Sequence, residues 1–179
     1  MPVPILVTYF GWLLPEAFVS QVVGLIPFPT IVSPYTALMY AVMLTYLPFS
    51  LGQFYKMSIS APTLGTVRKN DDVRKYNEQL KATHPMFSKL CAAEANSNEA
   101  FPFFAAAVLA AMQAGVTSAT VCLYATFWLA ARFAYTLVYA INGPLLSVVR
   151  SLIFVIALAV VGKLFALAAE QVSQPQSRQ

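Results

Sequence analysis

The chain has 179 residues, of which 59% are hydrophobic and 10% charged, with a mean hydropathy of +0.66 and a formal net charge of +4. A soluble domain carries about 25% charged residues, so this composition excludes an ordinary soluble protein and indicates an integral membrane protein. The cations between residues 56 and 89 lack the aromatic interleaving of a nucleic-acid site, so we expect a lipid bilayer and no nucleic acid as partner.

Residues 1–33 are apolar but interrupted by prolines at positions 2, 4, 15, 27 and 29. Early prolines together with Glu16 and Gln21 fit a cleaved signal peptide poorly, so this segment is expected to stay attached. We interpret it as an interfacial or re-entrant extension. The alternative that this segment forms a complete additional membrane span stays open.

Four later segments are long and apolar enough to cross a bilayer, which requires about 20 residues. Their approximate ranges are 34–57, 87–115, 117–141 and 145–169. The predicted fold class is therefore all-α integral membrane, a four-transmembrane-helix bundle within residues 34–170. Residues 171–179 are predicted to be a polar tail.

The connection at residues 58–86 is polar and basic, with a short helix expected at 71–82. The positive-inside rule places this loop in the cytoplasm. Counting crossings returns the turn at 142–144 to the same side. The polar residues of the later spans therefore gather at one membrane face, which argues against a small transporter, because a transporter needs polar groups along the whole crossing.

Polar side chains in the second span fall on two helical faces. Lys89, Ala92, Asn96 and Glu99 share one face by i+3 and i+4 spacing, and Glu94 lies on another face with Asn98. Purely structural roles are open for two of them: Glu99 can pair with an arginine, and Asn96 can form an interhelical hydrogen bond.

The third span carries Arg132, Tyr135 and Tyr139 on one face, and the fourth carries Arg150 between apolar neighbours. The tyrosines can also be packing residues, and Arg150 can reach the lipid headgroups. Taken together, however, the polar groups suit a small zwitterionic peptide. Glu99 can bind an ammonium group, arginines bind carboxylates bidentately, and Tyr and Asn groups add neutral hydrogen bonds.

Glutathione has that inventory of groups, with one ammonium, two carboxylates and two amides. Its thiol has an ordinary pKa of roughly 8.5, and a nearby guanidinium would favour the nucleophilic thiolate. Arg150 is the candidate for this catalytic role.

Three ordered motifs at these positions resemble the MAPEG family, the membrane-associated proteins of eicosanoid and glutathione metabolism. Residues 96–104 (NSNEAFPFF) are similar to the signature of its second helix. Residues 131–139 (ARFAYTLVY) are similar to its third-helix pattern, and Arg150-Ser151 resembles the pair that opens its fourth helix. The resemblance covers roughly residues 35–168.

The resemblance implies a homotrimer that binds glutathione, as a co-substrate, between neighbouring subunits near the cytoplasmic face. In a eukaryote it also implies an endoplasmic-reticulum-type membrane. Carried over by position, the residues that would bind glutathione are Asn96, Glu99, Tyr135 and Tyr139. Arg132 would support the site, and Arg150 would stabilise the thiolate.

The sequence departs from the family pattern at two positions. Ala92 stands where the family usually has an arginine, and Glu94 stands where it has His or Gln. Loss of a charged contact to a carboxylate can cost about 1.5–3 kcal/mol. Lys89, one turn earlier on the same face, is a candidate substitute, and Glu94 is kept as a candidate glutathione contact.

The first functional hypothesis is a membrane-bound glutathione transferase or peroxidase that acts on a lipophilic small molecule. The alternative is a non-catalytic, lipid-binding membrane scaffold of the same family, and a small transporter is third. Cys91 and Cys122 are far apart and form no metal-ligand pattern, so neither a metal site nor a disulfide framework is expected.

Overall fold

The computed structural model describes residues 14–26, 31, 33–60, 70–141 and 144–173. Within these ranges the chain forms helices and no strands. The helices are α2 (Glu16–Leu25), α3 (Pro34–Ser60), α4 (Asn70–Thr83), α5 (Pro85–Gln113), α6 (Ser118–Ala140) and α7 (Pro144–Ser173). The predicted all-α membrane bundle is confirmed.

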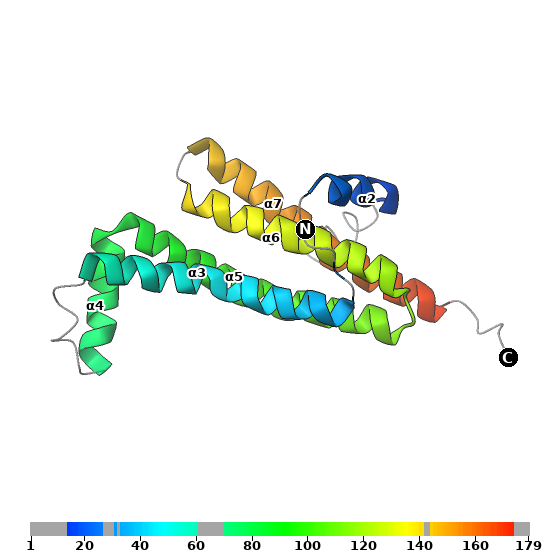
Figure 1. Ribbon diagram of the computed structural model, residues 1–179, viewed down its shortest axis with the longest axis horizontal. Helices are drawn as coiled ribbons and strands as arrows, with labels where there is room; N and C mark the ends of the chain where they lie inside the picture. The colour runs from blue at the N-terminus through cyan, green and yellow to red at the C-terminus, as the bar shows by residue number, and fades with distance from the viewer. Residues whose placement is uncertain (1–13, 27–30, 32, 61–69, 142–143, 174–179) are drawn as a thin grey trace, which may run out of the picture.

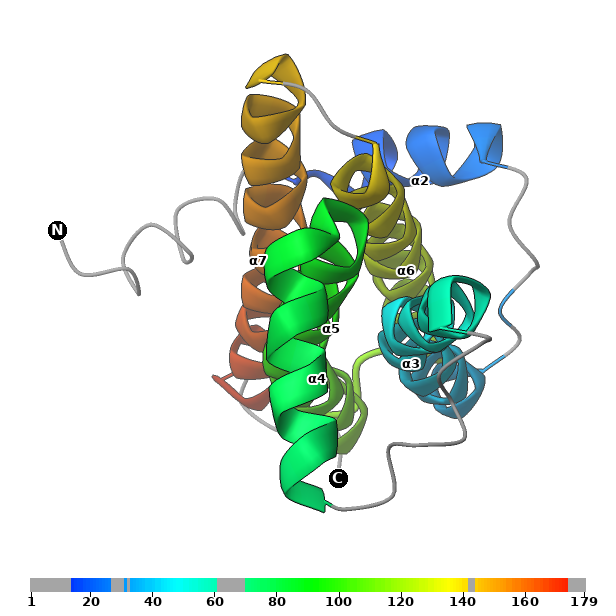
Figure 2. The ribbon, with the colours of Figure 1, turned by 90° about the vertical axis from the view of Figure 1, so that its left-hand side faces the viewer.

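The helices α3, α5, α6 and α7 run alongside one another and form the bundle (Figures 1 and 2). By length and composition, three segments within the described residues are able to cross a membrane, namely Pro34–Ile59, Ser118–Tyr139 and Ser147–Ser173. The more polar helix α5 is not among them, although it was expected as a fourth span. It lies along its three neighbours α3, α6 and α7 in the bundle, and its crossing of the membrane stays a prediction.

Local sequence explains where the bundle helices begin and end. Thr117 is the N-cap of α6, and its side-chain oxygen accepts a hydrogen bond from the backbone N–H of Thr120, as expected for a hydroxyl residue there. Gly115 ends the preceding turn with φ 86°, a backbone conformation that suits glycine. Pro48 and Pro102 lie inside α3 and α5, and both helices continue through them, as membrane helices allow.

The centre of the bundle is an aromatic pair between α5 and α6. The rings of Phe104 and Trp128 stack with centroids 3.9 Å apart and an interplanar angle of 7°, and both side chains are buried. Small residues such as Ala107 and Ala125 are fully buried around them. Small side chains let membrane helices approach closely, so packing rather than polar bonding holds this part together.

The helix α2 is the described part of the N-terminal extension. It spans 10 residues, or about 15 Å at 1.5 Å per residue, which is half the hydrocarbon thickness of a bilayer. It packs against α6: Val19 is fully buried, and the Tyr124 hydroxyl donates to the Leu14 carbonyl at 3.1 Å. This helix alone does not cross the membrane. Residues 1–13, 27–30 and 32 of the predicted extension lie outside the described residues.

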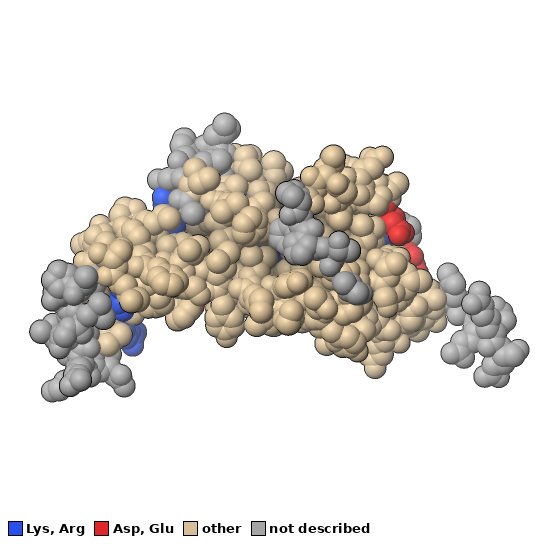
Figure 3. All heavy atoms as spheres, viewed as in Figure 1, with Lys and Arg blue, Asp and Glu red and all other residues tan. Residues whose placement is uncertain are grey.

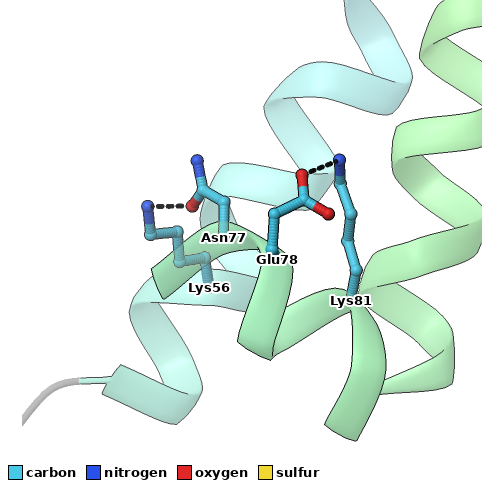
Figure 4. Close-up of polar contacts among 4 residues, drawn as sticks. All are labelled: Lys56, Asn77, Glu78 and Lys81. Atoms are coloured by element: carbon cyan, nitrogen blue, oxygen red, sulfur yellow. Dashed lines mark hydrogen bonds and ion pairs between the residues drawn. The ribbon is translucent and has the colours of Figure 1, made fainter. Parts of the chain in front are cut away.

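The helix α4 lies across one end of the bundle (Figure 1) and matches the helix expected at 71–82. Lys56 Nζ of α3 donates to Asn77 Oδ1 at 2.8 Å, and Lys81 Nζ lies 3.1 Å from Glu78 Oε1 (Figure 4). On the face shown in Figure 3, basic side chains lie towards the α4 end and acidic ones towards the opposite end.

Candidate functional site

A row of aromatic and cationic side chains follows one face of α6. The spacing of Trp128, Arg132, Tyr135 and Tyr139 by four, three and four residues places them on the same side of a helix. The guanidinium carbon of Arg132 is 5.9 Å from the Trp128 ring centroid and 4.7 Å from that of Tyr135. The rings of Tyr135 and Tyr139 follow, with centroids 5.6 Å apart. The predicted third-span face is therefore a continuous row.

Arg132 joins α6 to α5. Its Nη2 donates to the backbone carbonyl of Asn96 at 3.0 Å and to Ser97 Oγ at 3.1 Å. The side chain is 3% exposed, and its Nη1 has no hydrogen-bond partner among the described residues. No ion pair links it to a carboxylate in this part of the chain. A buried guanidinium is therefore stabilised by two aromatic rings and neutral oxygens alone, which is an unusual situation for a charge.

Arg150 continues the row from the beginning of α7. Its guanidinium carbon lies 4.6 Å from the ring centroid of Tyr139, within cation–π distance. Phe154, one turn further along α7, contacts Tyr135 with a centroid distance of 6.4 Å. Arg150 is thus not isolated between apolar neighbours, as its sequence context indicated, because the third helix supplies an aromatic partner.

A cavity of about 150 Å³ lies between α5, α6 and α7. Three of the predicted site residues line it: Asn96, Glu99 and Arg132. The remaining lining residues are Ala100, Phe103, Trp128, Phe154, Ala157, Leu158 and Val161. The polar part of the cavity therefore carries the amide of Asn96, the carboxylate of Glu99 and the guanidinium of Arg132. Helix α7 supplies an apolar wall. We call this cavity the α5–α7 cavity.

The polar groups of this cavity have few partners of their own. The amide of Asn96 donates to the carbonyl of Ala92 at 2.9 Å within α5, so the interhelical bond at this position comes from its backbone and not from its side chain. Glu99 is exposed and forms no ion pair within the described ranges, so the structural pairing with Arg132 or Arg150 is not formed. Its carboxylate is available to a ligand.

A second cavity, of about 590 Å³, lies between α3, α4 and α5. Glu94 and Asn98 line it, together with Cys91 and the Glu78–Lys81 pair. The two faces of α5 expected from helical spacing thus open into two different cavities. The structure does not place Glu94 beside Asn96 and Glu99.

Lys89 lines neither cavity. Tyr135, Tyr139 and Arg150 also lie outside the linings, but ring contacts connect them to Arg132 and Phe154 of the α5–α7 cavity. The structure therefore brings six predicted residues into one connected group and leaves Glu94 and Lys89 apart. The predicted roles of these two residues stay predictions.

Sequence reasoning missed Trp128, which lines the cavity, stacks on Phe104 and faces Arg132. Its position four residues before Arg132 places it on the same face of the helix, and this spacing is the sequence signal that could have identified it. Cys91 and Cys122 are free cysteines. Within the described ranges, no group of three or more His, Cys, Asp and Glu side chains is placed to hold a metal ion.

Comparison with models of known families gives a match of residues 33–169 to the family described as the MAPEG family. The matched range contains the whole aromatic and cationic row and both cavities, and it begins after α2. Comparison with curated proteins and with solved structures gives no match.

Proposed function

This chain belongs to the MAPEG family, and from that membership we propose that it is a membrane-bound glutathione transferase or peroxidase acting on lipophilic electrophiles. Family membership by itself supports a membrane protein of the glutathione-transferase and eicosanoid-metabolism type. Our proposal adds a specific activity and assigns roles to residues of this chain.

The observation that carries the proposal is the meeting of Asn96, Glu99 and Arg132 in one cavity beside an apolar wall. A carboxylate, a guanidinium and an amide complement the ammonium, carboxylate and peptide groups of glutathione. The unpartnered Nη1 of Arg132 and the unpaired carboxylate of Glu99 fit such a ligand, because each lacks the opposite charge that a peptide end brings.

The proposed reaction forms a bond between the glutathione sulfur and an electrophilic carbon of the lipophile. The thiolate donates the electron pair, and the leaving group departs with the pair of the bond that breaks. Arg150 would hold the negative charge of the thiolate, with Tyr139 beneath its guanidinium and Tyr135 next in the row. The lipophile would lie against the apolar wall formed by residues such as Phe154 and Leu158.

A second candidate is a non-catalytic lipid-binding scaffold on the same fold. Two observations favour it: Ala92 offers no charge to a carboxylate, and Arg150 lies outside the lining of the α5–α7 cavity. Such a protein would bind lipid through its apolar wall without activating a thiol.

The deciding experiment uses the purified full-length protein in detergent. We expect calorimetric binding of glutathione at millimolar concentration or below, and conjugation of a generic aromatic electrophile when glutathione is present. Binding without turnover would favour the scaffold. Absence of binding at millimolar glutathione would exclude the enzyme.

We also propose that the chain forms a homotrimer and that the α4 end faces the cytoplasm of an endoplasmic-reticulum-type membrane. The basic connection between α3 and α5 supports this orientation. In sealed microsomes, an impermeant maleimide should label Lys75→Cys and not Glu170→Cys, both in a background with Cys91 and Cys122 replaced by serine. Labelling of Glu170→Cys and not of Lys75→Cys would show the opposite orientation in the membrane.

Native mass spectrometry of the purified protein would test the proposed homotrimer.

A further inference from the structure

The larger of the two cavities has no part in the proposed reaction. It has a volume of about 590 Å³ and lies between α3, α4 and α5, and we call it the α3–α5 cavity. Small-molecule sites usually have volumes of roughly 300–1,000 Å³. The two cavities share no lining residue, so a ligand of the α3–α5 cavity is separate from one in the α5–α7 cavity.

The α3–α5 cavity reaches from the α4 end of the bundle into its membrane-spanning part. The helix α4 runs across the bundle axis (Figures 1 and 2) and forms one wall of the cavity. Phe49 and Gln53, which belong to the spanning segment Pro34–Ile59, line it on α3. Phe49 is 41% exposed, so the cavity borders a surface that faces acyl chains. A ligand here can keep its polar part in the cavity and its apolar part in the lipid.

The α4 wall carries the cations of the cavity, Arg74 and Lys81. Lys81 Nζ lies 3.1 Å from Glu78 Oε1 (Figure 4), so its charge is compensated. Arg74 is exposed and forms no ion pair with another described residue. Guanidinium groups bind phosphates bidentately, and basic pockets between membrane helices on the cytoplasmic side bind phospholipid headgroups. Arg74 therefore suits a phosphate.

The α5 wall carries an acid that lacks a partner. Glu94 lies about 13 Å along α5 from Pro85, at 1.5 Å per residue, and lines the cavity together with Pro48 of the spanning segment. It forms no ion pair within the described ranges, and ionisable groups within a membrane are costly and usually serve a site. Asn98 also lines the cavity, and its backbone carbonyl lacks the usual helical donor because the fourth residue after it is Pro102. This wall is rich in acceptors and suits a group with several N–H donors.

The balance of charges in the lining decides between kinds of headgroup. Because Glu94 is present, a purely anionic headgroup would be attracted by Arg74 and repelled by Glu94. A choline headgroup has both charges, but its trimethylammonium has no N–H to donate. A primary ammonium donates three hydrogen bonds, as that of lysine does. A headgroup that joins a phosphate to a primary ammonium therefore complements both walls.

We propose that the α3–α5 cavity binds the headgroup of a phospholipid that joins a phosphate to a primary ammonium, as in phosphatidylethanolamine. Arg74 binds the phosphate, Glu94 binds the ammonium, and the acyl chains lie along α3 beside Phe49. The inference is independent of the proposed glutathione chemistry, because no residue of the α5–α7 cavity takes part in it. It gives Glu94, which stands where the family usually has His or Gln, a role that does not involve glutathione.

The test uses purified full-length protein in detergent, without glutathione, and native mass spectrometry in an equimolar mixture of phosphatidylethanolamine and phosphatidylcholine with the same acyl chains. We expect the protein to hold phosphatidylethanolamine about tenfold more often, the size expected for hydrogen bonds to a charged group. Phosphatidylglycerol, which has the phosphate but no ammonium, should bind no better than phosphatidylcholine. Equal binding of the three lipids, or tightest binding of phosphatidylglycerol, would overturn the proposal.

Substitution of Glu94 tests the ammonium end of the headgroup. In Glu94→Gln the preference for phosphatidylethanolamine over phosphatidylcholine should fall to about twofold or less. Glu170→Gln, which changes an exposed acid near the end of α7, should keep the full preference. A preference that survives Glu94→Gln, or one that Glu170→Gln removes, would contradict the assignment of Glu94.

Substitution of Arg74 tests the phosphate end, which both lipids share. In Arg74→Gln both lipids should bind about threefold more weakly with their ratio unchanged, a small effect because Arg74 is exposed and solvent screens its charge. The neighbouring Lys75→Gln, exposed on α4 and outside the lining, should bind both lipids as the wild type does. Unchanged binding in Arg74→Gln would remove Arg74 from the site.

Two competition measurements on the wild type identify the source of the headgroup. Glycerophosphoethanolamine, the same headgroup without acyl chains, should not displace the lipid at tenfold excess, because burial of the chains adds to the affinity of the lipid. Displacement would make the occupant a soluble compound. Millimolar glutathione should not displace the lipid either, and displacement would make the α3–α5 cavity part of a glutathione site. Each of these displacements would overturn the proposal.

Discussion

Replacement of Arg150 by alanine is expected to lower the turnover number for conjugation by about 100-fold or more, the size seen when one preorganised donor to a developing or resident anion is removed. The effect should fall on turnover, because Arg150 lies outside the lining of the α5–α7 cavity and contacts the Tyr139 ring instead. The KM for glutathione should change little. Steady-state kinetics and the ultraviolet absorbance of the bound thiolate measure both quantities.

Two variants control this prediction. Arg150→Lys keeps a positive charge but loses the planar guanidinium over the Tyr139 ring, so it should retain about a tenth of the activity. Lys75→Gln, exposed on α4 and remote from the row on α6, should behave as the wild type. Full turnover and an unchanged thiolate absorbance in Arg150→Ala would remove Arg150 from the mechanism.

Phe104→Ala is expected to lower the free energy of unfolding by about 3 kcal/mol, at the lower end of the range for aromatic-to-alanine changes in protein cores. Phe104 is fully buried and stacks on Trp128 at 3.9 Å, so its removal leaves a void between α5 and α6. The lower end applies because lipid tails are as apolar as the protein interior, which leaves lost packing as the main cost. Helical circular dichroism during unfolding in mixed micelles measures the change.

Phe103 is the matched control, because it is the neighbouring phenylalanine on the same helix and is 63% exposed. Phe103→Ala should change the unfolding free energy by no more than about 0.5 kcal/mol, as exposed positions usually do. Equal destabilisation by the two variants would show that the Phe104–Trp128 stack does not hold α5 to α6.

The fold was largely predictable because the bundle helices carry local signals. Long apolar runs, the prolines at 34 and 144, and Thr117 before α6 place the helix ends close to the observed ones. The family expected from the motifs is confirmed by the match over residues 33–169. The place of helix α5 was harder to predict, because the polar residues in its first half keep it from standing out as an apolar span. Its position follows from its packing against α3, α6 and α7.

The candidate site was predictable within each helix and not between helices. Helical spacing correctly separates Asn96 and Glu99 from Glu94 and Asn98, because periodicity is a property of one helix. It does not say which cavity each face meets, since that depends on how α3, α4, α6 and α7 pack around α5. For the same reason the cation–π contact of Arg150 with Tyr139, which joins two helices, could not be read from either segment alone.

The polar character of α5 has a consequence for how the protein reaches its membrane. A helix with Glu94, Glu99 and a central proline partitions poorly into lipid when it leaves the translocon alone, since ionisable groups are costly there. The helix α6 supplies Arg132, whose hydrogen bonds to Asn96 and Ser97 cross to α5. The two segments are consecutive in the chain, so they can enter the bilayer as one hairpin. Insertion of α5 would then depend on the same contacts between α5 and α6 that shape the α5–α7 cavity.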